Sequence, residues 1–227
     1  MTRPPLVHVA VVGAVLALAL AGCPGRPART AADPAALEGL EPSVRRVAGL
    51  EQTEPTPVAI WDAGMTAASP ALRAVRGWEV VGGAAGVRVD LAAQRKGVKT
   101  TSSEWLRPAG DRLECLARAI GRDVVRLDPP QPVLVGPLEA GRAWRWEGTA
   151  GDAPAVAEFR VRRAGVEKDR FTVEVEQTTR AAGLEARRVV TWAEGLGVVR
   201  EEGVQPAADE AAPPEEYHLR PPAPAGP

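Results

Sequence analysis

Histidine is almost absent from this sequence, which contains only His8 and His218. His8 lies near the start of the chain and His218 lies in a proline-rich tail, so the long region between them has none. Catalysis by Ser-His-Asp or Cys-His arrangements needs an imidazole as general base, and many zinc sites need imidazole ligands. The region between the two histidines therefore offers neither of these chemistries.

Other chemical signatures are scarce as well. The chain has two cysteines and a formal net charge of -1, so nothing in its charge predicts nucleic acid as a partner. No Gly-x-Ser-x-Gly elbow, phosphate-binding loop, paired zinc cysteines or calcium-loop spacing occurs. We therefore predict that the protein is not an enzyme and that it needs no cofactor.

One long apolar run is present, and it begins close to the N-terminus. Arg3 precedes it, and residues 6–21 are apolar apart from His8. The run is shorter than the roughly 20 residues that a membrane-spanning helix needs, and its zones match an export signal. It ends in Leu20-Ala21-Gly22-Cys23, which resembles the lipobox of bacterial lipoproteins.

The resemblance to a lipobox implies cleavage after Gly22 and attachment of diacylglycerol to Cys23. Two or more acyl chains hold a protein stably on a bilayer, so the membrane is an expected partner through the lipidated Cys23. Pro24 stands where an aspartate favours the inner membrane in enteric bacteria, and this favours an outer-membrane location in the cell envelope. The alternative is an ordinary secretory peptide followed by a coincidental cysteine.

Composition divides the chain into four parts. We expect a signal peptide, a lipid-anchored tether, an antiparallel β domain and a disordered tail rich in proline and acidic residues, at residues 1–22, 23–57, 58–205 and 206–227. Apolar residues between Leu37 and Val47 fall at helical spacing. A short helix interrupted by Gly39 and Pro42 is therefore the alternative for that part of the tether.

Alternation of apolar and polar residues predicts strands throughout the third part. In the stretch 171–176, Phe171, Val173 and Val175 share one face, while threonine and glutamate share the other. Similar runs separated by turn residues bring the count to about nine strands. The fold class is therefore mainly β, with a single curved antiparallel sheet that forms a half-barrel or open barrel, because so many strands curl to protect their edges.

Two segments are harder to interpret. The stretch 112–120 fits either a helix or a strand, and its short length favours a strand. The stretch 128–132 contains Pro129, Pro130 and Pro132. Because proline cannot donate to a ladder of hydrogen bonds, we expect an extended crossing segment here rather than a central strand.

Two short motifs resemble a pattern in uncharacterised bacterial envelope lipoproteins. One is the Pro-Leu-x-x-Gly-x-x-Trp segment from Pro137 to Trp144, and the other is Gly195-Leu196-Gly197 before a final strand. Those proteins are similar in architecture to the outer-membrane lipoprotein carriers, whose antiparallel half-barrel holds acyl chains on its concave face. The resemblance implies a half-barrel here, although the sequence shows no equivalents of the helices that cover the carriers' sheet.

Tryptophan is the most frequent aromatic residue, and it provides the candidate ligand contacts. Of six tryptophans, we assign Trp144, Trp146 and Trp192 to the core of the sheet. Trp61 and Trp105 are the expected exposed pair and the candidates to line a site for an apolar ligand. Cys115, which has no second cysteine once Cys23 carries lipid, is interpreted as a small buried hydrophobic residue.

The remaining candidates are carboxylates that cluster in sequence around one hairpin. Asp111, Glu114, Asp123 and Asp128 could supply an acid and base pair for an envelope hydrolase. Turn and surface positions explain them more simply. The leading hypothesis is a non-enzymatic, membrane-anchored binding module for an apolar ligand or an envelope protein, and the alternative is a structural component of the envelope without a ligand pocket.

Overall fold

A computed structural model describes residues 37–61, 67–95, 98–181 and 183–203. Within these ranges it contains the helix α2 and eleven strands. The bounds of these elements are α2 Pro42–Ala48, β1 Thr56–Trp61, β2 Ser69–Val81, β3 Ala84–Arg95, β4 Val98–Ala109, β5 Arg112–Ile120, β6 Asp123–Val135, β7 Ala143–Ala150, β8 Ala153–Glu167, β9 Arg170–Ala181, β10 Leu184–Ala193 and β11 Gly197–Gly203.

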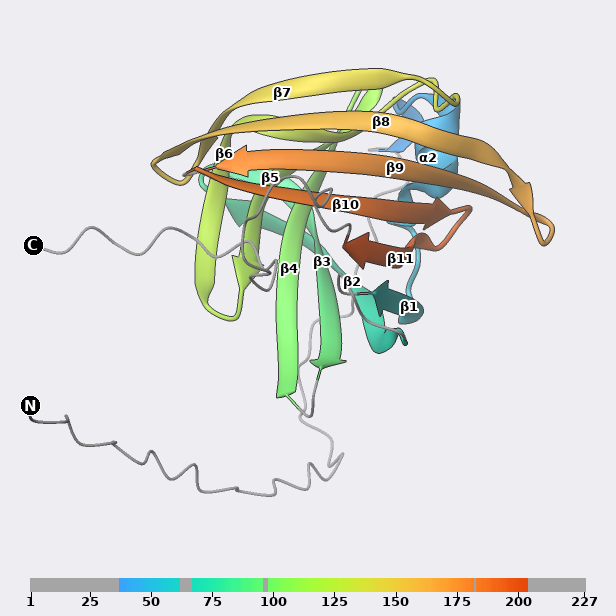
Figure 1. Cartoon of the computed structure of the whole chain (residues 1–227), viewed down its shortest axis with the longest axis horizontal. Helices are drawn as coiled ribbons and strands as arrows, with labels where there is room; N and C mark the ends of the chain where they lie inside the picture. Colours follow the sequence, from blue (N-terminus) through green and yellow to red (C-terminus); the bar gives the residue numbers. More distant parts are fainter. Residues whose placement is uncertain (1–36, 62–66, 96–97, 182, 204–227) are drawn as a thin grey trace, which may run out of the picture.

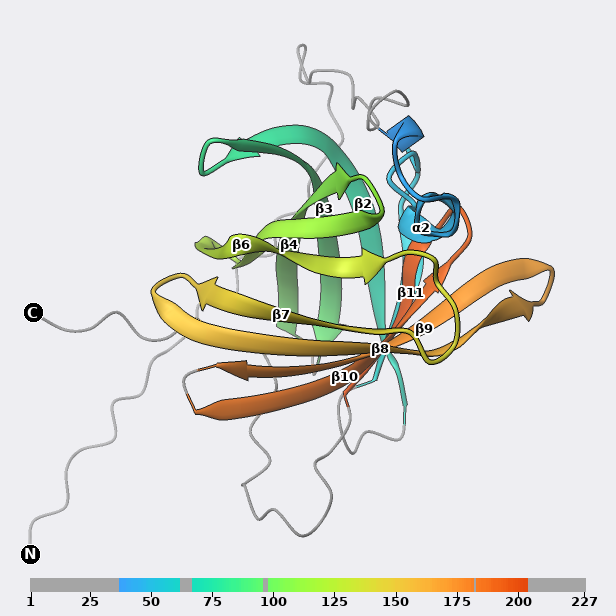
Figure 2. The ribbon, with the colours of Figure 1, turned by 90° about the horizontal axis from the view of Figure 1, so that it is seen from above.

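The eleven strands form one closed barrel, shown from two sides in Figures 1 and 2. Consecutive strands are antiparallel neighbours, and the barrel closes where β1 runs parallel to β11, with Ala59 opposite Arg200. The prediction of a mainly β fold is confirmed, but the prediction of a half-barrel or open sheet is wrong. Pairing the first strand with the last removes both free edges of the sheet, which is the reason for closure.

The proline-rich stretch 128–132 lies within β6, so the prediction that it would not join a strand between two neighbours is wrong. The structure accommodates the prolines by interrupting the ladders. On the β5 side the register jumps from Ala117 opposite Arg126 to Cys115 opposite Gln131. On the β7 side, the pairing ends at Asp128. Pro129 and Pro130 therefore fall in the interruption of the β5 ladder, whereas Pro132 lies opposite Glu114 beside a register shift. The stretch 112–120 is the strand β5, as its length indicated.

The interior of the barrel is a packed apolar core. The residues predicted to share one face of 171–176 point into it, with Val173 and Val175 almost fully buried. Trp146 and Trp192 are buried there too, and Trp144 packs against the cluster, so the assignment of these three tryptophans to the core is confirmed. Cys115 is also fully buried in this core, as a small hydrophobic residue would be.

One end of the barrel is closed by α2 and the residues beside it (Figures 1 and 2). The Glu41 carboxylate accepts a hydrogen bond from the N–H of Val44, Pro42 begins the helix, and Gly49 ends it in the left-handed conformation. The apolar residues of this segment are buried in the barrel core, namely Leu37, Leu40, Val44, Val47, Ala48 and Leu50. The segment that we predicted to be a tether as far as residue 57 thus contributes to the core from Leu37 onward.

We call the segment 37–50 the plug. The buried Arg73 on β2 joins the plug to the barrel. Its guanidinium donates hydrogen bonds to the carbonyl oxygens of Ala48 at 3.2 Å, Gly49 at 3.0 Å and Leu196 at 3.1 Å. These carbonyls end α2 and form the turn between β10 and β11. Gly197 packs so tightly that an added Cβ would lie 2.5 Å from the Arg73 guanidinium carbon. One side chain therefore joins the N-terminal segment to the last hairpin.

The outer wall over β7 to β10 carries arginine and glutamate side chains that form ion pairs within and between strands. Arg163 bonds Glu167 at 2.8 Å, and Arg180 bonds Glu185 at 2.6 Å. Other pairs cross between strands, including Arg145 with Glu158 at 3.8 Å. The outer wall over these strands is therefore polar and highly charged.

Candidate functional site

A very small cavity lies inside the barrel, beside the apolar core. A cavity of about 20 Å³ is lined by residues from β4, β6, β8, β9, β10 and β11, so it lies within the barrel. Ligand pockets usually measure roughly 300–1,000 Å³, whereas a cavity of this size holds about one water molecule. This cavity therefore has no room for an acyl chain or another apolar ligand.

Charged side chains from four strands lie around this cavity. Glu104 on β4 pairs with Arg118 on β5 at 2.9 Å. Arg188 on β10 donates to the Gln177 amide oxygen at 3.0 Å and lies 3.6 Å from Glu201 on β11. The network is electrically balanced, with two arginines and two glutamates. Three of its members, Glu104, Arg188 and Glu201, line the interior cavity.

The protonation states in this network follow from the competition between burial and opposite charge. Burial alone would raise the pKa of Glu104, but the positive charges of Arg118 and Arg188 outweigh it and hold this pKa below its ordinary value. Burial raises the pKa of the Cys115 thiol to about 12. A thiol with this pKa stays protonated and is not a nucleophile. At neutral pH, Glu104 is therefore ionised beside its arginines, and Cys115 is a neutral thiol.

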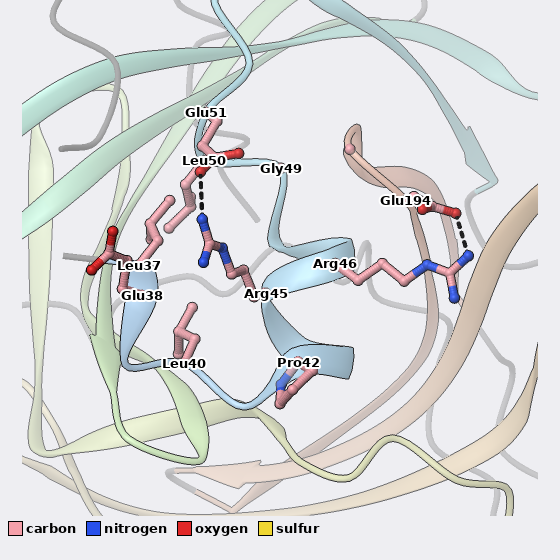
Figure 3. Close-up of a pocket in the computed structure, with 11 residues that line it drawn as sticks. Leu37, Glu38, Leu40, Pro42, Arg45, Arg46, Gly49, Leu50, Glu51 and Glu194 are labelled. Carbon is pink, nitrogen blue, oxygen red and sulfur yellow. Dashed lines mark hydrogen bonds and ion pairs between the residues drawn. The ribbon is translucent and has the colours of Figure 1, made fainter. Parts of the chain in front are cut away.

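A larger space lies outside the barrel, at the end closed by α2. This groove, which we call the α2 groove, has a volume of about 530 Å³. It is lined by Leu37, Glu38, Leu40, Pro42, Arg45, Arg46, Gly49, Leu50, Glu51, Glu194 and Gly195. Figure 3 shows that its residues come from α2, from the segments that precede and follow α2 in the chain, and from the turn between β10 and β11. The volume is within the range of binding sites.

The rim of the α2 groove is built from charged pairs. Arg46 bonds Glu194 at 2.8 Å, and Arg45 lies 3.6 Å from Glu51 (Figure 3). The hydrogen bond from Arg46 lowers the pKa of Glu194, as does the bond from the Phe171 N–H. Exposed pairs of this kind contribute little to stability, so they can exchange their partners for charges on a docked molecule.

The structure does not bring the two candidate tryptophans together. Trp105 is buried on the outer face of the sheet, packed with Leu116, and its indole N–H donates to Glu79 at 3.1 Å. The expectation that it is exposed is therefore wrong. Trp61 is half-buried on β1, where the Arg200 guanidinium lies 5.6 Å from the ring centroid. Neither tryptophan lines the interior cavity or the α2 groove, and their role as ligand contacts stays a prediction.

The candidate carboxylates are also dispersed. Asp111 precedes β5 and Asp123 follows it, so a strand of nine residues, about 30 Å long, separates them. Asp111 is exposed and pairs with its neighbour Arg112 at 3.1 Å. Asp123 and Asp128 are exposed on β6. The clustering of these residues in the sequence therefore does not produce a paired site in space.

Several predicted features lie outside the described residues. These are the signal peptide, Gly22, Cys23, the first part of the tether and the C-terminal tail from residue 206. Among the residues that the structure describes, no helix is long and apolar enough to cross a membrane. The same residues contain no group of three or more histidine, cysteine, aspartate or glutamate side chains that could hold a metal ion.

Comparison with known proteins yields no match: no family model, no curated protein and no solved structure is significantly similar to this chain.

Proposed function

We propose that this protein is a non-enzymatic binding module of the bacterial cell envelope, held on the membrane by lipid on Cys23, and that it binds an envelope protein at the α2 groove. The observation that carries this proposal is the contrast between the two spaces. The interior cavity of about 20 Å³ is too small for a ligand, whereas the α2 groove of about 530 Å³ is rimmed by charges.

The position of the groove along the chain supports a partner at the membrane surface. Leu37, which lines the groove, is separated from Cys23 by a stretch that spans at most about 50 Å when fully extended. The described part of the chain begins beside the groove, at Leu37, and the turn between β10 and β11 contacts α2 there through the bond from the Gly195 N–H to the Arg46 carbonyl oxygen. A lipid on Cys23, with the outer membrane as the favoured location, would therefore keep the α2 groove within reach of proteins at that membrane.

The chemistry of the groove favours a protein over a small apolar ligand. Its leucine side chains are almost fully buried, so the accessible rim consists mainly of Arg45, Arg46, Glu38 and Glu51. Mixed charges of this kind set the orientation of a protein partner and accelerate its association. An uncharged acyl chain would gain little from them.

Site-specific photocrosslinking in intact cells tests this proposal. A photoreactive residue at Glu38 or Glu51 is expected to give the same discrete protein adduct, because both positions line one groove. The matched control is Glu158, an exposed glutamate on the outer wall of β8, which is expected to give no such adduct. Equal adducts from all three positions, or none from the two groove positions, would overturn the proposal and favour a structural envelope component without a specific docking site.

A further inference from the structure

The end of the β8–β9 hairpin extends beyond β7 and keeps a free backbone edge (Figures 1 and 2). The ladder between β7 and β8 begins with Ala143 opposite Arg160, and Val161 bonds the residues just before β7. Residues 163–167 continue β8 and pair with β9 on one side. Among the residues that the structure describes, no strand pairs with their other side. We call this stretch the β8 edge.

The hydrogen bonds of Phe171 on β9 show which backbone groups of the β8 edge are free. The Phe171 carbonyl oxygen accepts from the Glu194 N–H, and the Phe171 N–H donates to the Glu194 carboxylate, so both groups point away from β8. Val166 lies opposite Phe171, and in such a pair the backbone groups of both residues point away from each other. The same alternation applies two residues earlier, at Ala164 opposite Val173. The N–H and C=O groups of Ala164 and Val166 therefore point outward from the edge, where they form a template for another strand.

The side chains leave this edge accessible to a strand of suitable charge. Val166 is 67 % exposed, and a Cβ added at Gly165 would meet no atom within 4 Å apart from its chain neighbours. Arg163 at the start of the edge and Glu167 at its end are exposed and form an ion pair at 2.8 Å, so they lie on the same face. Like charges directly opposite each other in a sheet are destabilising. A docked strand must therefore place a negative charge opposite Arg163 and a positive charge opposite Glu167.

The β8 edge of a second copy meets this requirement when it runs antiparallel. With Gly165 opposite Gly165 of the second copy, each Arg163 lies opposite Glu167, and each Ala164 lies opposite Val166. Each of these Ala164–Val166 pairs can exchange both of its N–H···O=C bonds, which uses the groups that are free in the monomer. A register centred on Ala164 or on Val166 instead loses both ion pairs between Arg163 and Glu167. The charges and the free backbone groups thus favour the same register.

We propose that the β8 edge is an interface for a second copy of this chain, in which two hairpins join into one antiparallel sheet around a two-fold axis at Gly165. Such an interface uses one self-complementary patch twice, which is the commonest arrangement in homo-oligomers. The pairing of Arg163 with Glu167 makes it selective, because a strand with arginine opposite Arg163 is repelled. This inference depends neither on the α2 groove nor on lipid at Cys23.

A cysteine at the proposed axis tests this pairing in whole cells. In the full-length chain carrying Cys23→Ala, Gly165→Cys places two cysteines across the axis, where opposing Cα atoms lie about 4.5 Å apart, a separation that a disulfide can bridge. Cys115 does not compete, because it is buried and its raised pKa keeps the thiol protonated. Treatment with diamide, a membrane-permeant thiol oxidant, is expected to produce a disulfide-linked dimer of the Gly165→Cys chain.

The matched control is Arg162→Cys, which introduces an exposed cysteine beside the same edge but away from the axis. In the proposed register its two copies lie about 20 Å apart, so we expect no disulfide-linked dimer. If Gly165→Cys gave no dimer, or if Arg162→Cys formed one equally fast, the proposal would be overturned. A disulfide from Gly165→Cys to a different protein in place of a second copy would overturn it as well.

Charge reversal tests the register. In the Gly165→Cys chain, Arg163→Glu places glutamate opposite Glu167 on both sides of the axis, and we expect the disulfide-linked dimer to form about tenfold more slowly. Adding Glu167→Arg restores opposite charges, so the original rate is expected to return. Both side chains are exposed, and circular dichroism checks that the variants keep the fold. A rate unchanged by Arg163→Glu, or not restored by Glu167→Arg, would refute the register, while the crosslinking result at the α2 groove would be unaffected.

Discussion

Replacement of Arg73 by methionine tests whether one buried cation holds the plug in the barrel. The side chain is 3 % exposed, and its guanidinium bonds three carbonyl oxygens that belong to Ala48, Gly49 and Leu196. Methionine fills a similar volume but donates no hydrogen bond. The Arg73→Met variant would therefore leave three buried or partly buried carbonyls without this donor.

The expected change is the difference between two opposing effects. Burial lowers the pKa of Arg73 from 12.5 to about 10, which corresponds to a cost of roughly 3 kcal/mol for keeping the charge in the folded protein at neutral pH. Methionine removes this cost. Leaving a buried carbonyl unpaired costs about 1–3 kcal/mol, or roughly 6 kcal/mol for three. We therefore expect the free energy of unfolding to fall by about 3 kcal/mol.

Urea denaturation of wild type and variant at pH 7, followed by tryptophan fluorescence and circular dichroism, measures this difference. The matched control is Arg160→Met, because Arg160 is exposed on the outer wall and its loss is expected to change stability by less than about 0.5 kcal/mol. If Arg73→Met were as stable as wild type, the free-energy cost of burying the guanidinium would equal or exceed the stability that its three hydrogen bonds contribute. The interpretation of Arg73 as the residue that secures the plug would then be refuted.

Two further variants test the plug and the outer face. Gly49→Ala is expected to destabilise the protein by more than about 2 kcal/mol, because the residue has a φ of +60° and a Cβ would lie 2.2 Å from the Gly197 nitrogen; an unchanged melting temperature would contradict this. For Asp90, burial opposes ionisation, but bonds from Arg88, Ser103 and Arg76 lower its pKa from 3.8. The ionised Asp90 carboxylate therefore stabilises the folded protein at any pH above its ordinary pKa. This stabilisation is lost as the pH falls through the lower pKa that Asp90 has in the folded protein. The difference in free energy of unfolding between wild type and Asp90→Asn should be constant from pH 7 to about pH 5 and shrink below about pH 4. A difference that grows in acid would refute a lowered pKa for Asp90.

The sequence predicts some parts of the candidate sites but not their assembly. Helical spacing around Val44 and Val47 and the proline at position 42 are visible in the chain, so α2 itself was foreseeable as an alternative. That its apolar face enters a barrel depends on Arg73 and Gly197, which are distant in sequence. Nothing local to Trp105 distinguishes an exposed ring from one covered by Leu116 on the outer face.

Local patterns therefore determined the elements. Alternation at Phe171, Val173 and Val175 specifies a strand with one dry face, because side chains alternate between the faces of a sheet with a period of two. Closure was decided only by tertiary structure, since the pairing of Ala59 with Arg200 joins residues from opposite ends of the domain and has no local signal. The same holds for the boundary between β6 and β7: prolines show where a ladder is weak, but only the folded barrel brings the Trp144 and Trp146 indoles to the β6 carbonyl oxygens.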